Sequence, residues 1–263
     1  MLQFSKLDKA IDAKNKMGKH VICLMIVICG LTTSCIYYPH LTSVPLIKEK
    51  GDTRIEGGVG LVSQSLQVSF SQGATEKIAY QLAASMDPYG YYSGSPGLYA
   101  QGAIGTYKNI QSKNVMELYG GFAYGSSCAY NDANPGNLHG NYQVYFAQFN
   151  YGDIEQRKAN LEYGLGLKAG FLHSKMTDKV YFFSRDDYST VGPYPVYRIN
   201  GLLLEPTLFL RFGGKRLKFF TTLGASLYHQ LNHTDKCLPT NPFNLGLGIS
   251  YSLMPTKNKK LHE

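Results

Sequence analysis

The sequence contains no tryptophan, and only 17% of its 263 residues are charged. After the first 30 residues no segment approaches about 18 consecutive apolar residues, which excludes a second membrane-spanning helix. No glycine-rich loop follows a strand and opens a helix, although there are 28 glycines. A phosphate-binding loop is therefore not indicated, and the glycines recur at strand spacing.

Cysteine is also scarce, with five residues in the whole chain. An apolar run of about ten residues, Val21–Gly30, has the length of a signal-peptide core and is too short to span a membrane as a helix. Small residues then lead into Cys35. This pattern resembles a bacterial lipoprotein signal, which implies cleavage before Cys35 and a lipid on that cysteine. The alternative is a plain secretory signal with an incidental cysteine.

We therefore predict a signal peptide over residues 1–34, with Met17 as an alternative start, and a lipid-anchored leader over 35–50. Removing 1–34 takes away five lysines and two aspartates, so the net charge of +8 falls to about +5. The basic tail at 254–263 is interpreted as a solvated end. Nucleic acid is not expected as a partner of an exported chain, whereas outer-membrane lipid is.

From Gly51 onward the hydrophobic pattern has a period of two. In 244–253, for example, Leu245, Leu247 and Ile249 alternate with Gly246, Gly248 and Ser250. Such alternation predicts strands with one apolar and one polar face. A polar face built from glycine, serine, tyrosine and charges of both signs fits the narrow interior of a membrane barrel.

About ten strands are predicted by this pattern. They cover 52–62, 64–72, 77–87, 97–108, 113–126, 140–151, 157–172, 200–213, 215–229 and 242–253. Long connections at 88–96, 127–139, 173–199 and 230–241 alternate with short ones, and only the first connection breaks the pattern. Membrane barrels have short periplasmic turns and long outer loops. We predict an all-β fold: a closed antiparallel transmembrane barrel over 51–253 in the outer membrane. A lipid on Cys35 would then lie in the inner leaflet beside the first strand.

Short motifs add a resemblance to this prediction. Tyr38–Pro39, Pro45–Gly51 and Leu204–Pro206 resemble stretches of an uncharacterised family of outer-membrane β-barrel lipoproteins from Bacteroidota-type bacteria. The resemblance covers most of 35–253 and implies a location and a fold, but no settled activity. The polar tail departs from the many barrels that end on an aromatic residue.

Charged residues of both signs are predicted to face the lumen. A paired network is favoured over a narrow pore or an acid–base site, because an unpaired buried charge is costly. The residues are Arg54, Glu56, Glu117, Glu162, Lys168, Glu205, Arg211, Arg216 and Lys218.

Two weaker site patterns lie near the predicted outer loops. His229, His233 and Cys237 are four residues apart, but they fall at a strand end and in a loop, so a metal site is not favoured. His173–Ser174 and Asp186–Asp187 lie at the predicted outer rim without a local catalytic signature.

The sequence thus predicts a non-enzymatic lipoprotein barrel without a cofactor, for envelope structure or surface binding of an unknown ligand or protein partner. An outer-membrane hydrolase of protease or lipase type is the alternative, and a narrow passive pore is the third. Cys128 and Cys237 are both predicted in outer loops on the exported side. A disulfide across the barrel mouth and two free thiols both remain open for this pair.

Overall fold

The computed structural model describes residues 42–87, 97–110, 113–131, 136–154, 161–180, 195–232 and 243–253. No helix among these residues is long and apolar enough to span a membrane. The strands are β1 (Thr53–Gly60), β2 (Leu66–Gly73), β3 (Ile78–Asp87), β4 (Gly97–Ile110), β5 (Asn114–Asn131), β6 (Gly136–Asp153), β7 (Glu162–Val180), β8 (Val196–Gly213), β9 (Leu217–Ala225), β10 (Leu227–Gln230) and β11 (Phe243–Leu253).

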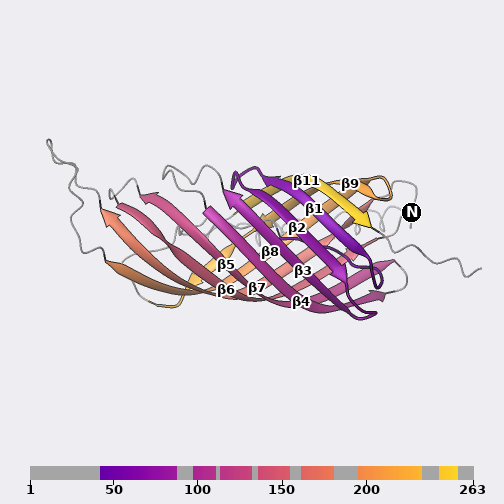
Figure 1. Cartoon of the computed structure of the whole chain (residues 1–263), viewed down its shortest axis with the longest axis horizontal. Coiled ribbons are helices and arrows are strands. Elements are labelled where there is room, and N and C mark those ends of the chain that lie inside the picture. The colour runs from indigo at the N-terminus through magenta and orange to yellow at the C-terminus, as the bar shows by residue number, and fades with distance from the viewer. Residues whose placement is uncertain are drawn as a thin grey trace, which may run out of the picture. The chain divides into compact units, whose positions relative to one another are not determined.

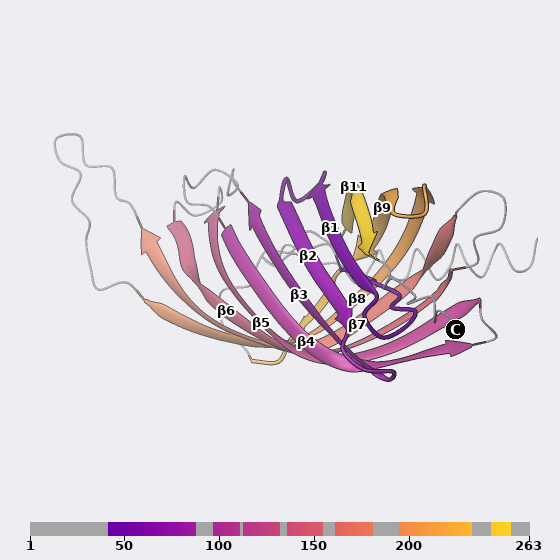
Figure 2. The same cartoon turned by 45° about the vertical axis from the view of Figure 1, so that its right-hand side comes forward.

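These strands form one closed antiparallel barrel. Each of β1 to β7 pairs with the next strand in the chain, β11 pairs with both β1 and β9, and β9 pairs with β8. Only Ser226 separates β9 from β10, and both pair with β8, so they are two parts of one interrupted strand. Figure 2 shows β11 and β9 beside β1 and β2, where the sheet closes. The predicted barrel of about ten strands is confirmed.

The outer wall is apolar over a limited height. Leu165 and Leu245 are 40% and 38% exposed, so the strands present their apolar face outward. Exposed aromatic residues bound the apolar band, with Tyr163 near one end of β7 and Phe171 at the middle of this strand. The eight residue steps from Tyr163 to Phe171 cover roughly 26 Å of strand, or about 20 Å of height at the tilt of a barrel. This approaches the roughly 25 Å band of outer-membrane barrels, so the chain has an outer-membrane-type fold.

Four strands are much longer than the sequence pattern predicted. β5 to β8 have 18 or 19 residues each, against 8 to 10 in β1 to β3, and Figure 1 shows them extending at one end. The predicted long connection at 127–139 was therefore wrong, since only 132–135 separate β5 from β6. The predicted connection at 173–199 was too wide, because 181–195 separate β7 from β8. The next outward residues beyond Gln143, His173 and Asn200 are the polar Asn141, Lys175 and Arg198, so the apolar alternation is interrupted while the backbone pairing continues.

The interior changes character along the barrel. Toward the long-strand end it holds an apolar cluster that includes Tyr142, Val144, Leu172 and Ile199. Toward the end with the short turns it holds charged side chains and the residues that precede β1. The buried charged side chains are therefore concentrated in this half of the barrel.

Candidate functional site

Residues 42–49, here called the plug segment, lie inside the charged half of the barrel. Residues 42–47 are all buried, and Leu46 and Ile47 have no exposed surface. Each fully buried aliphatic side chain contributes roughly 1.5–3 kcal/mol. The plug segment runs along the lumen. At its C-terminal end Lys48 pairs with Glu162, the first residue of β7, whereas nearer its N-terminal end Ser43 contacts Gln148, which lies further from the short turns within β6.

Hydrogen bonds tie the plug backbone to the barrel wall. The Ile47 amide donates to Glu117 Oε1 at 2.7 Å. The Ser43 carbonyl accepts from Gln148 Nε2 at 2.8 Å, and the Val44 carbonyl accepts from Arg211. Because a buried backbone group without a partner is costly, these side chains are needed to hold an irregular segment in the lumen.

Glycines in the wall make room for the plug. A Cβ on Gly73 would lie 2.6 Å from the Glu49 carbonyl oxygen, and one on Gly152 would lie 2.6 Å from Leu46 Cδ1. Leu46 itself has a φ of 53°, an uncommon backbone conformation for a leucine that its complete burial maintains. Gly51, with a φ of 82°, then turns the chain into β1.

Glu162 is the centre of an ion-pair network next to the plug segment. Its carboxylate lies 2.8 Å from Arg54 Nη1, 2.9 Å from Lys218 Nζ, 3.4 Å from Lys48 Nζ and 3.7 Å from Arg211 Nη1. The partners come from β1, β9, the plug and β8, so one carboxylate joins three strands and the plug to β7.

Two more carboxylates connect this network to the plug. Glu56 lies 2.7 Å from Arg211 Nη2 and accepts a hydrogen bond from Ser43 Oγ at 3.0 Å. Glu117 accepts from Asn150 Nδ2 at 2.8 Å in addition to the plug amide. Both carboxylates therefore accept hydrogen bonds from plug donors, and Glu56 also neutralises a wall cation.

A separate pair lies nearer the apolar cluster. Lys168 Nζ is 3.4 Å from Glu205, 3.0 Å from the Tyr99 hydroxyl and 3.1 Å from Gln101 Oε1. The ammonium also lies 4.6 Å from the centre of the Phe146 ring, within cation–π distance. This lysine is fully engaged and has little freedom to act on a ligand.

The structure brings most of the sequence-predicted lumen charges together. Five join in the network around Glu162, Glu117 joins through the plug, and Lys168 and Glu205 form their own pair. Arg216 is the exception and that prediction was wrong, because it lies exposed in the connection between β8 and β9. The short turn places it beyond the last lumen-facing position of either strand.

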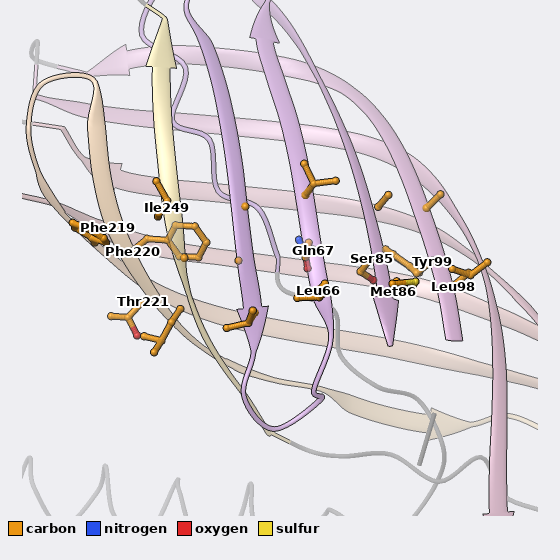
Figure 3. A pocket seen from close by; sticks show the side chains of 18 of the residues that line it. Leu66, Gln67, Ser85, Met86, Leu98, Tyr99, Phe219, Phe220, Thr221 and Ile249 are labelled. Carbon is orange, nitrogen blue, oxygen red and sulfur yellow. The ribbon is translucent and has the colours of Figure 1, made fainter. Parts of the chain in front are cut away.

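Two hollows of very different size are found among the described residues. A cavity of about 20 Å³ lies among Ser43, Glu56, Arg211 and Thr222, and this volume holds about one water. A larger hollow of about 1200 Å³ is lined mostly by exposed apolar side chains of β1, β2, β4, β9 and β11, several of which Figure 3 labels. None of the described residues that line this hollow is charged.

The remaining predicted residues do not assemble into a site. His229 is exposed on β10, and His233, Cys237 and Cys35 lie outside the described residues. Among those that are described, no group of three metal-ligand side chains occurs. Cys128 lies within β5, opposite His139 of β6, and not in a loop as predicted, because β5 continues to Asn131.

His173 and Ser174 point to opposite faces of β7. Ser174 is completely buried and donates to the Ile199 carbonyl, whereas His173 Nδ1 lies 2.6 Å from Asn200 Oδ1. Consecutive residues of a strand alternate between faces, so these two cannot form a catalytic dyad. Asp186 and Asp187 lie outside the described residues.

Sequence reasoning missed the plug itself. The leader has no period of two or 3.6, so no pattern in it predicts a buried element. One signal was available: Val44, Leu46 and Ile47 are apolar residues in a segment that was predicted only as a lipid-anchored leader.

No protein-family model matches the sequence, and no curated protein matches it. Among solved structures, the outer membrane protease OmpT from Escherichia coli aligns with a TM-score of 0.49 and 6% identity, over 78% of this chain and 94% of that one. The N-terminal β-barrel domain of Pseudomonas aeruginosa OprF aligns with a TM-score of 0.32 and 13% identity, over 78% of this chain and all of that one. We infer nothing about activity from likenesses this distant.

Proposed function

We propose that this chain is a non-enzymatic outer-membrane lipoprotein, in which a closed barrel holds its long outer strands at the cell surface for binding or envelope structure. The observation that carries the proposal is the filled lumen. The plug segment is bonded to the wall by a network of both charge signs, and an apolar cluster fills the other half.

The filled lumen argues against a passive pore. Water and ions would have to pass the buried plug and then the side chains of Tyr99, Tyr142 and Leu172. The cavity found beside the plug has room for only about one water. A conducting state would require the plug to leave and the apolar cluster to separate.

A hydrolase is also not supported by the described residues. The histidine and serine adjacent in sequence face opposite sides of β7, and the serine is buried. The large hollow has no charged lining among the described residues, so it lacks an acid, a base or an electrophile for hydrolysis.

The lipid anchor belongs to the same proposal. Cys35 lies seven positions before Thr42, which lies in the lumen, so a lipidated Cys35 is confined to within about 25 Å of that point. A barrel and an anchor joined by so short a tether fit a protein that stays in one membrane. Mass spectrometry of the native N-terminus tests this part, and an unmodified Cys35 would contradict it.

Planar-bilayer recording tests the filled lumen. We expect wild-type protein, with insertion checked by the heat-dependent gel mobility of a folded barrel, to give no steady conductance above the lipid baseline. Inserted protein that gives regular open-channel steps would overturn the proposal in favour of the pore.

A further inference from the structure

Two cations face each other on the outer wall just beyond the apolar band. Lys175 of β7 and Arg198 of β8 are direct register partners, and both are exposed. Directly opposed strand residues have Cβ atoms roughly 5 Å apart, and like charges at this position are destabilising. Among the described residues neither side chain forms an ion pair.

The neighbouring rows place this pair at a membrane boundary. One step toward the band, Gln143, His173 and Asn200 form a polar row across β6, β7 and β8. The next step is apolar, with Tyr145 55%, Phe171 39% and Leu202 50% exposed. Aromatic side chains collect where the hydrocarbon meets the headgroups, so the cations lie at headgroup height.

We propose that Lys175 and Arg198 bind the phosphate of an outer-leaflet lipid whose acyl chains lie on the apolar row beneath. A phosphate between the two side chains would convert their mutual repulsion into two charge-assisted contacts, and the planar guanidinium of Arg198 matches phosphate oxygens in a bidentate way. The polar row can hydrogen-bond the rest of a headgroup. The inference rests on the outer-membrane location in the proposed function.

This end of the barrel is the outer one by the geometry of the chain. It carries the long strands and their connections, whereas the opposite end carries the three-residue turn between β8 and β9. Short turns face the periplasm in outer-membrane barrels. The occupant is therefore a lipid of the outer leaflet.

The inference is tested by whether K175Q/R198Q melts above or below wild type in lipid with and without phosphatidic acid. Full mature protein would be placed in vesicles of digalactosyldiacylglycerol, a bilayer lipid without a phosphate, with or without dimyristoyl phosphatidic acid as the phosphate probe. In the galactolipid alone we expect the K175Q/R198Q variant to melt at a higher temperature than wild type, because the repulsion is gone. With phosphatidic acid we expect the order to reverse, because wild type gains a bound phosphate.

Native mass spectrometry of the same proteins measures binding directly. We expect the dissociation constant of phosphatidic acid to be about tenfold lower for wild type than for K175Q/R198Q. This ratio corresponds to the loss of roughly one good charge contact. K108Q is the matched control, since Lys108 is an exposed cation of β4 near the opposite end. Its lipid affinity should equal that of wild type.

Three results would overturn the inference. They are equal lipid affinity of wild type and K175Q/R198Q, an equal loss in K108Q, and displacement of the lipid by inorganic phosphate, which would mean a site for a free anion. The proposed function fails on a different measurement. A barrel that conducts and still shows the reversal would reject the closed lumen and support the phosphate site.

Discussion

At the residue scale, Glu162 is the side chain on which the lumen network depends. It is 1% exposed, and the cations of Arg54, Arg211 and Lys218 that surround it are also buried. Isolated buried charges are costly to desolvate, and the cost is offset only when opposite charges meet at close range. One carboxylate therefore allows several wall cations to remain charged beside the plug.

Replacing Glu162 by glutamine should destabilise the barrel strongly. The substitution keeps the shape but leaves buried cations without their main counter-charge, so we expect a loss of about 3–5 kcal/mol in the free energy of unfolding. Guanidinium unfolding in detergent micelles measures this value. Glu76→Gln, at an exposed position between β2 and β3, should change it by less than about 0.5 kcal/mol. Similar small changes in both variants would contradict the central role of Glu162.

The alternation of faces could be predicted from the sequence, whereas the pairing of the charges could not. Period-two patterning indicates that Arg54 and Glu162 point inward. That they touch depends on barrel closure, which brings β1, β7, β8 and β9 around one lumen. Arg216 was misplaced because the pattern does not show where a strand ends and its turn begins.

At the element scale, the plug segment and the wall are matched in shape. Gly73 of β2 has no side chain where the Glu49 carbonyl and Ile47 approach it. Gly73 lies opposite Ala79 of β3, and its backbone exchanges hydrogen bonds with Gly51 and Asp52 on the other side. Because the strand is held on both sides, a side chain at Gly73 must displace the plug and not the strand. The plug is thus positioned both by its hydrogen bonds and by the absence of a side chain at Gly73.

Replacing Gly73 by valine should loosen the plug. Overpacking of this kind costs about 1–3 kcal/mol, and the plug is the part able to yield. Hydrogen–deuterium exchange of the peptide covering 42–49 should be faster than in wild type, since the Ile47 amide would lose its bond to Glu117. Gly120→Val is the control, because a Cβ on Gly120 meets nothing within 4 Å. Unchanged protection of the plug in Gly73→Val would show that the glycine does not seat it.

The lengths of β5 to β8 could not be predicted for a physical reason. Inside the membrane the lipid selects apolar residues on the outer face, and this selection produces the pattern that identifies a strand. Above the membrane the outer face meets water, as Asn141, Lys175 and Arg198 show, and the inner face becomes apolar. The polarity inverts while the hydrogen-bonded ladder continues, so an apolar-outward pattern ends too early.

At the scale of the whole molecule, the barrel combines two kinds of interior in one sheet. The half within the membrane band has an apolar outside and a charged inside, and the half beyond it has a polar outside and an apolar inside. The charged half depends on a segment from outside the barrel to fill it. The closed lumen is therefore a joint property of the wall and the plug segment.

The position of the plug segment is the claim on which the closed barrel most depends, and an engineered disulfide tests it most directly. Ser69 Oγ lies 3.2 Å from Ser43 Oγ, a separation that suits a bond between cysteines at the two positions. In a chain with Cys128 and Cys237 replaced by serine, we expect S43C/S69C to form this bond on mild oxidation. S43C/S85C is the control, because Ser85 of β3 faces the same lumen opposite Gln67, two residues along from Ser69, and we expect no bond there. Peptide mapping of folded S43C/S69C that recovers both cysteines alkylated without reduction would contradict a plug inside the lumen.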